Sequence, residues 1–196
     1  MALGGLGAVG GLLALESAGA LETRGVAAAL GTEVGEVVVR VVSGPWSPDQ
    51  VARWLEGARI PVRLAGLTQR GPLVVSLWYR FDGRDLWCAT RSGADIVQHV
   101  RADPRVGIEV APDLPPYRGV RGTGRAEVVA TAGAATLDAL IVRYLDDRNG
   151  ALAADLRRAA ARGEVALRIA ALTLTSWDFS ARMARQEDRP ELPELG

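Results

Sequence analysis

The sequence contains no lysine, and its 23 basic residues are therefore all arginine. This absence excludes a reaction that runs through a lysine Schiff base. The basic residues are balanced by 23 acidic ones, so the formal net charge at pH 7 is zero. A zero net charge gives no support to a nucleic-acid binder or to a protein that docks on an acidic membrane. We therefore expect neither nucleic acid nor a membrane among the partners.

Cysteine and histidine each occur only once, as Cys88 and His99. A single cysteine excludes an internal disulfide, a CxxC motif and a cysteine zinc cluster, and it fits a reducing cytoplasm. We expect no metal site, a cytoplasmic location, and a Cys88 side chain that is small and buried. The Walker, HExxH and GxSxG motifs are also absent from the sequence.

Composition divides the 196 residues into three parts. Residues 1–45 hold 10 of the 23 glycines, and the apolar run at 1–15 is shorter than the roughly 20 residues that a membrane span needs. No basic residue precedes that run, as one would in a signal peptide. We interpret 1–45 as an extension outside the domain; the alternative is an added element that packs on it, with a strand at 36–42. The domain is predicted at 46–184, followed by an acidic, proline-containing and mobile tail at 185–196.

The rest of the chain is organised around residues 73–91, LVVSLWYRFDGRDLWCATR. Asp82-Gly83 between two apolar runs is a strong signal of a β-hairpin. The first strand, 73–81, has no clean polar face, which predicts that it is buried on both sides. Because the interior of one barrel covers only one face of a strand, the other face needs cover, and we expect a homodimer.

Hydrophobic periodicity and cap signals predict the remaining elements. A capping box, Ser47 with Gln50, starts a helix that ends at Gly57. Ser92 is expected to cap a second helix, with Asp95 in its first turn. The full set is helices at 48–57, 93–102, 136–148 and 151–162, and strands at 59–67, 73–81, 85–90, 105–111, 117–129 and 164–175. This order predicts a mainly β fold with helices (α+β), an antiparallel barrel with helical cover rather than a doubly wound α/β sheet.

Residues from about 47 to 183 resemble the pyridoxamine 5'-phosphate oxidase-like split-barrel flavoproteins. The resemblance rests on the order and spacing of three pieces: VVSLWYRFDGRDLWCATRSGADIVQHVRADPRVGIEV, YRGVRGTGRAEV and LRIAALTLTSWDF. It implies a split β-barrel that forms a homodimer, with two cofactor sites along its interface. The family includes FMN oxidases, coenzyme F420-dependent reductases and haem-handling members. FMN is therefore the expected cofactor and F420 the alternative, while haem ligation by His99 is not favoured.

The activity that this resemblance implies is hydride transfer between the bound cofactor and a small organic substrate, with the protein supplying position and electrostatics. No protein nucleophile is required, so no catalytic residue is assigned. Two other functions stay open. One is a non-catalytic protein that binds a flavin, a deazaflavin or haem, and the other is a structural dimer whose site has been lost.

The resemblance also implies which residues meet the cofactor. The strand at 74–77 would run beside the flavin or deazaflavin ring, and the turn at 90–92 would meet the cofactor phosphate. Trp177 would either pack over the ring or plug a barrel end. The expected cofactor-binding set is Val74, Val75, Ser76, Leu77, Thr90, Arg91, Ser92, Arg118, Arg121 and Trp177.

The turn departs from the family pattern in one respect. Many relatives carry lysine just after the serine of this turn, facing the phosphate, whereas this chain has Ala94 and Asp95. A carboxylate beside a phosphate is unfavourable, so positive charge would have to come from elsewhere. The arginines that qualify are Arg70, Arg118, Arg121 and Arg125, because arginine suits bidentate phosphate binding. Arg118 and Arg121 are spaced so that at most one of them is expected to point into the site.

Overall fold

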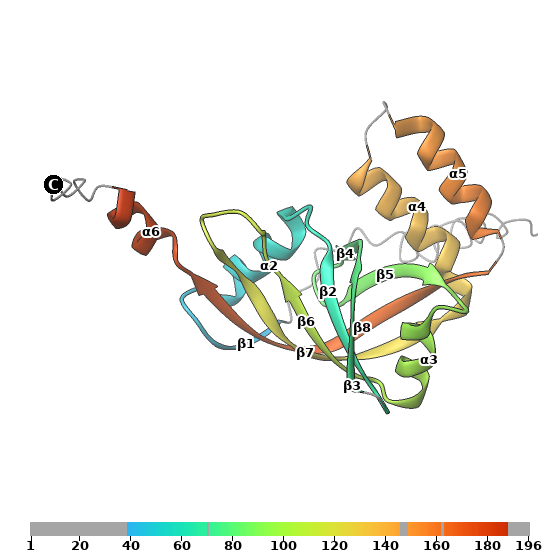
Figure 1. The fold of residues 1–196 in the computed structure, drawn as a ribbon, viewed down its shortest axis with the longest axis horizontal. Helices are drawn as coiled ribbons and strands as arrows, with labels where there is room; N and C mark the ends of the chain where they lie inside the picture. Colours follow the sequence, from blue (N-terminus) through green and yellow to red (C-terminus); the bar gives the residue numbers. More distant parts are fainter. Residues whose placement is uncertain (1–38, 70, 146–148, 162, 188–196) are drawn as a thin grey trace, which may run out of the picture. The chain divides into compact units, whose positions relative to one another are not determined.

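The computed structural model describes residues 39–69, 71–145, 149–161 and 163–187. Within these ranges, eight strands form one curled sheet in the order β3-β2-β6-β7-β8-β5-β4, and β1 pairs with β8 off this path (Figure 1). The strands are β1 Arg40–Ser43, β2 Val62–Thr68, β3 Gly71–Leu77, β4 Tyr79–Phe81, β5 Leu86–Arg91, β6 Arg105–Val110, β7 Arg118–Val129 and β8 Glu164–Asp178. The helices are α2 Pro48–Gly57, α3 Asp95–Ala102, α4 Gly133–Tyr144, α5 Gly150–Ala160 and α6 Ser180–Glu187, and a 3-10 turn spans Ala130–Ala132. The expected fold class, mainly β with helices, is confirmed.

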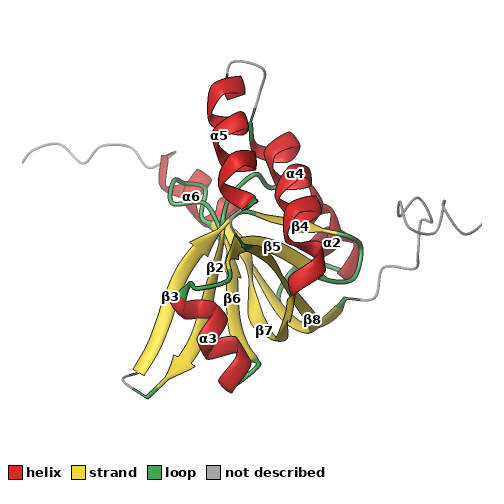
Figure 2. Ribbon diagram, turned by 90° about the vertical axis from the view of Figure 1, so that its right-hand side faces the viewer, coloured by secondary structure: helices red, strands yellow, loops and turns green. Residues whose placement is uncertain are grey.

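One face of the curled sheet packs on the core. α3 lies against β2 and β7 and buries Ile96, Val97 and Val100, while α4 packs on β5 and β8 and α5 packs on α4 (Figure 2). Cys88 on β5 is fully buried in this core, as expected. Burial raises the pKa of its thiol to about 12, so Cys88 stays uncharged at neutral pH.

The expected capping box at the start of α2 is confirmed. The Ser47 hydroxyl accepts a hydrogen bond from the Gln50 N–H, and the Gln50 side chain accepts one from the Ser47 N–H at 2.8 Å. At the other end of α2, Arg143 of α4 donates to the carbonyls of Leu55, Glu56 and Ala58. The last carbonyls of a helix have no partner within it, and a cation suits that end of the dipole. Arg143 therefore ties α4 to α2.

The central hairpin forms, but its first strand is not continuous. β4 pairs with β5 around the Asp82-Gly83 turn, whereas β3 pairs with β2, so the expected strand 73–81 divides at Trp78. The expectation that this strand is buried on both sides is wrong for β3, where exposure alternates and Val74 is 59% exposed. The physical reason is that the alternate residues Leu73, Val75 and Leu77 pack against the core, whereas no described element covers the face that carries Val74.

The expected cap at Ser92 is also wrong. α3 begins at Asp95, its N-cap is Ala94, and no side chain caps it. The Ser92 N–H donates to the Gly163 carbonyl at 2.8 Å, and the Ala94 N–H donates to the Arg91 carbonyl at 3.0 Å. The chain thus turns once more after Ser92 before the helix starts, and Asp95 becomes the first helical residue.

The segment Arg40–Ser43, which precedes Trp46, belongs to the sheet as β1. β1 pairs with β8 in parallel, and Val39 is 7% exposed within the core cluster. This agrees with the alternative in which part of residues 36–42 forms a strand on the domain. Other ends shift by a few residues: α4 runs from 133 to 144 rather than from 136, and β8 continues to 178. Most of the expected extension 1–45 and of the expected tail 185–196 lies outside the described residues.

Candidate functional site

The sheet face that points away from the core is exposed, and we call it the open face. Its side chains alternate with core side chains along β2, β3 and β6. Cross-strand register aligns these side chains in rows that run from β3 through β2, β6, β7 and β8 to β1. One row consists of Ser76, Arg63, Glu109, Arg121, Thr175 and Ser43. The next row consists of Val74, Ala65, Gly107, Thr123, Thr173 and Arg40. Positions far apart in the sequence thereby come together on one surface.

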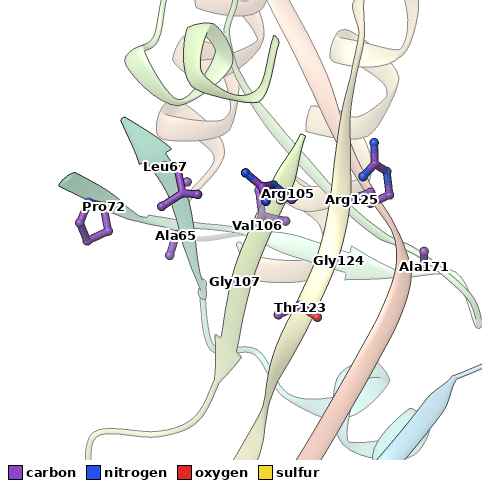
Figure 3. Close-up of a pocket in the computed structure, with 11 residues that line it drawn as sticks. Ala65, Leu67, Pro72, Arg105, Val106, Gly107, Thr123, Gly124, Arg125 and Ala171 are labelled. Carbon is purple, nitrogen blue, oxygen red and sulfur yellow. The ribbon is translucent and has the colours of Figure 1, made fainter. Parts of the chain in front are cut away.

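Two neighbouring hollows mark the open face. Hollow A has a volume of about 670 Å³ and includes Arg63, Val74, Arg121 and Thr175 in its lining. Hollow B has a volume of about 510 Å³ and includes Leu67, Pro72, Arg105, Arg125 and Ala171 (Figure 3). Ala65, Gly107 and Thr123 line both. These small residues leave the face hollow, since a Cβ placed on Gly107 would come no closer than 3.6 Å to another atom, the Ala65 Cβ.

Hollow A carries an uncompensated positive charge. Arg63 lies 3.5 Å from the Glu109 carboxylate and donates to the Ala111 carbonyl at 2.9 Å. Arg121 is exposed and has no hydrogen bond or ion pair to any residue that the structure describes. An arginine that is free to make two parallel hydrogen bonds is suited to a phosphate or a carboxylate.

The family model described as pyridoxamine 5'-phosphate oxidase matches residues 47–178. The chain belongs to this family. No curated protein matches the sequence.

Three solved structures illustrate what the fold is similar to. A conserved hypothetical protein from Mycobacterium tuberculosis is 25% identical with a TM-score of 0.55, over 78% of this chain and 94% of that one. A protein titled F420 reductase is 22% identical with a TM-score of 0.50, over 60% of this chain and 90% of that one. A FAD-binding protein from Mesorhizobium loti is 20% identical with a TM-score of 0.47, over 67% of this chain and 93% of that one.

The structure of this pyridoxamine 5'-phosphate oxidase family member brings two of the expected site residues together. Val74 and Arg121 line the same hollow, A. Ser76 lies in the row of Arg121 on the open face, whereas Val75 and Leu77 point to the other side of β3 and pack against the core. The outer edge of β3 pairs with none of the strands described, because β2 is its only sheet neighbour.

The expected phosphate turn lies where β5 ends. Thr90 and Arg91 close that strand, and β5 also contacts β3. Arg91 is exposed and stands opposite Glu164 of β8 in the register. Burial raises the pKa of Glu164, and Arg91 opposes that shift. With Asp95 at the start of α3, two carboxylates therefore flank the turn. None of the three residues 90–92 lines hollow A or B.

Arg118 and Trp177 lie together at the far end of β7 and β8, where Gly119 stands opposite Trp177 in the register. Arg118 lies over the Trp54 ring at 5.5 Å, and Trp177 packs on Phe179 at 5.8 Å between ring centroids. Neither lines hollow A or B, whereas Arg121, three residues from Arg118, does. The two arginines therefore lie apart, with Arg118 over the Trp54 ring and Arg121 in hollow A. Arg70 lies outside the described residues.

Sequence reasoning missed Arg63, Thr175 and Ser43. Their only local signal is the alternation of polar and apolar residues along each strand, and their meeting depends on the strand order. Within the described ranges, no three His, Cys, Asp or Glu side chains come together in a way that could hold a metal ion. None of the described helices is long and apolar enough to cross a membrane.

Proposed function

We propose that this protein is an oxidoreductase that binds FMN, or alternatively F420, on the open face and transfers a hydride between that cofactor and a small organic substrate. The observation that carries the proposal is hollow A, where the exposed Val74 of β3 shares one cavity with Arg121, an arginine without a partner among the described residues. Family membership and the F420 reductase fold support the same choice.

The residues of hollow A fit such a cofactor. A flat ring needs an apolar wall, which Val74 and the small residues Ala65 and Gly107 provide. Backbone groups along the free edge of β3 are available to the polar edge of a ring. Arg121 supplies a cation for the phosphate. The cofactor, when bound, supplies the hydride chemistry, and the protein holds and orients it.

A titration of FMN, F420 and riboflavin tests this proposal. Arg121→Gln is expected to weaken FMN and F420 binding by about 1.5–3 kcal/mol, the range for a hydrogen bond to a charged group. Riboflavin lacks the phosphate, so its affinity should not change. Arg53→Gln is the matched control, because Arg53 is an exposed arginine on α2 that lines neither hollow. Equal losses for riboflavin and FMN would show that Arg121 does not meet the phosphate.

We also infer that a second copy of the chain covers part of the open face. Leu67 and Val74 are 51% and 59% exposed there, and large apolar side chains grouped on one face favour an interface. Light scattering at micromolar concentration is expected to give the mass of a homodimer. A monomer at that concentration would contradict this inference.

A cytoplasmic location is part of the same proposal. It is supported by the single, fully buried cysteine, which fits a reducing compartment. A tagged chain found outside the cytoplasm would overturn it.

A further inference from the structure

Hollow B combines an apolar lining with two arginines at one end. Leu67, Pro72 and Ala65 line one side, and Arg105 and Arg125 stand on the neighbouring strands β6 and β7 (Figure 3). These arginines are direct cross-strand partners. Like charges directly opposite each other destabilise a sheet. A pair of this kind needs negative charge nearby, and Asp103 supplies one unit of it.

Among the described residues at this end of hollow B, two arginines and one carboxylate leave one positive charge uncompensated. Arg105 forms a bidentate pair with Asp103, with its Nε 2.9 Å from Oδ1 and its Nη2 2.6 Å from Oδ2. Hydrogen bonds from Arg105 hold the pKa of Asp103 at about 2, so Asp103 is ionised at neutral pH and compensates Arg105. Arg125 has no hydrogen bond or ion pair within the described part of the chain. Glu127, two residues along the same strand, lies 3.8 Å from Arg168 instead.

The amount of uncompensated positive charge indicates whether a carboxylate or a phosphate fits better. A carboxylate carries one negative charge, whereas a phosphate monoester carries about 1.5 to 2 at pH 7. The bidentate pair commits Arg105 to Asp103, so one arginine is left at hollow B and matches a carboxylate. At hollow A the Arg63–Glu109 contact is a single one at 3.5 Å, so that Arg63 as well as Arg121 can face a phosphate. Leu67 and Pro72 form an apolar lining, which suits a ligand with an alkyl or aryl body.

The backbone at hollow B is strained. Ala171, which lines it, has a φ of +52°, and the pairing of β7 with β8 shifts register between Thr123 and Arg125. A non-glycine residue in this conformation is costly, and such residues cluster at ligand sites. The irregularity faces the same cavity as the two arginines.

We propose that hollow B binds a small molecule with an apolar body and one carboxylate group. Because hollows A and B share Ala65, Gly107 and Thr123, such a molecule would lie beside a cofactor in hollow A. The substrate class of the enzyme is then a carboxylic acid whose apolar body carries a group that accepts the hydride, such as an activated carbon–carbon double bond, and this assignment of a role rests on the proposed function. The binding site itself does not.

Three ligands with one shared body test the site on the full-length protein: 4-phenylbutyrate, 4-phenyl-1-butanol and 4-phenylbutyl phosphate, titrated by calorimetry or NMR. The carboxylate is expected to bind at least about tenfold more tightly than the alcohol, as one charge-assisted hydrogen bond implies. Arg125→Gln should remove that difference. Arg53→Gln, at an exposed arginine on α2 that lines neither hollow, should keep it. Leu67→Ser should weaken the acid and the alcohol alike.

The outcomes separate this site from the proposed function. Equal affinity for acid and alcohol, or no effect of Arg125→Gln, overturns the site, and tighter binding of 4-phenylbutyl phosphate overturns the choice of carboxylate. Binding that appears only after a dimer is diluted to monomers would mean that a second copy occupies hollow B. FMN binding is expected to respond to Arg121→Gln and not to Arg125→Gln. Loss of all FMN binding with the acid preference kept would contradict the cofactor proposal and leave this site standing.

Discussion

Replacing Arg168 by methionine is expected to lower the free energy of unfolding by about 3 kcal/mol, the lower end of the range for breaking a buried ion pair. Asp85 is 3% exposed, and its Oδ2 accepts a hydrogen bond from Arg168 Nε at 2.7 Å and lies 2.7 Å from Arg168 Nη2 in the same ion pair. Its Oδ1 has no partner among the described residues. Methionine keeps the length and apolar stem of the side chain while leaving a buried carboxylate without its cation.

An exposed ion pair of the same length provides the control. Arg157 and Asp138 join α5 to α4 at 2.7 Å, with side chains that are 49% and 57% exposed. Because water compensates both charges when the pair is broken, Arg157→Met should cost less than about 1 kcal/mol. Chemical denaturation of the three proteins measures the difference. Similar losses for the two variants would mean that burial of Asp85 does not decide the strength of its pair.

Arg91→Ala is expected to weaken the binding of FMN and F420 by about 1.5–3 kcal/mol if the turn at the end of β5, and not Arg121 in hollow A, holds the phosphate. In that case Arg121→Gln should have no effect on either cofactor. The start of α3 adds free N–H groups and the positive end of its dipole, which favour an anion. Asp95, its first residue, opposes this, so Asp95→Lys should strengthen binding by turning a repulsion into an attraction. Fluorescence titration of both cofactors against the variants gives the affinities.

Two controls make this second prediction specific. Riboflavin has no phosphate and should bind equally well to all variants. Ser92→Ala should leave the stability of α3 unchanged, because Ser92 does not cap that helix and its N–H is engaged by Gly163. If Arg91→Ala binds both phosphate-bearing cofactors as well as the wild type does, the turn is only a connection between β5 and α3.

Local signals predicted the elements that depend on neighbouring residues. The capping box at Ser47, the hairpin turn at Asp82-Gly83 and the end of α3 at Asp103 are all set by contacts within a few residues. Ser92 shows the limit of this reasoning. A serine before a glycine and an apolar periodicity is typical of a cap, but the Gly163 carbonyl engages the Ser92 backbone, and the helix starts later.

The burial of β3 and the lining of hollow A depend on the strand order, which the sequence does not predict. Residues 73–81 form one apolar run, yet β3 and β4 pair with different strands, so the faces of β3 are buried unequally. Hollow A needs Arg63, Arg121 and Thr175 to stand side by side, which follows from the β2-β6-β7-β8 order and not from their spacing in the sequence. Family resemblance singled out Arg121 and Val74 but not Arg63 or Thr175.

The mass of the small molecule that stays with the protein tests the central claim most directly. The full-length protein is incubated with FMN, F420 and haem together, separated from free ligand by gel filtration, and denatured, and the released molecule is identified by mass spectrometry. The account predicts FMN, or F420 in its place, in a ratio of about one per chain. Retention of haem alone, or of none of the three, would contradict a flavin or deazaflavin site on the open face.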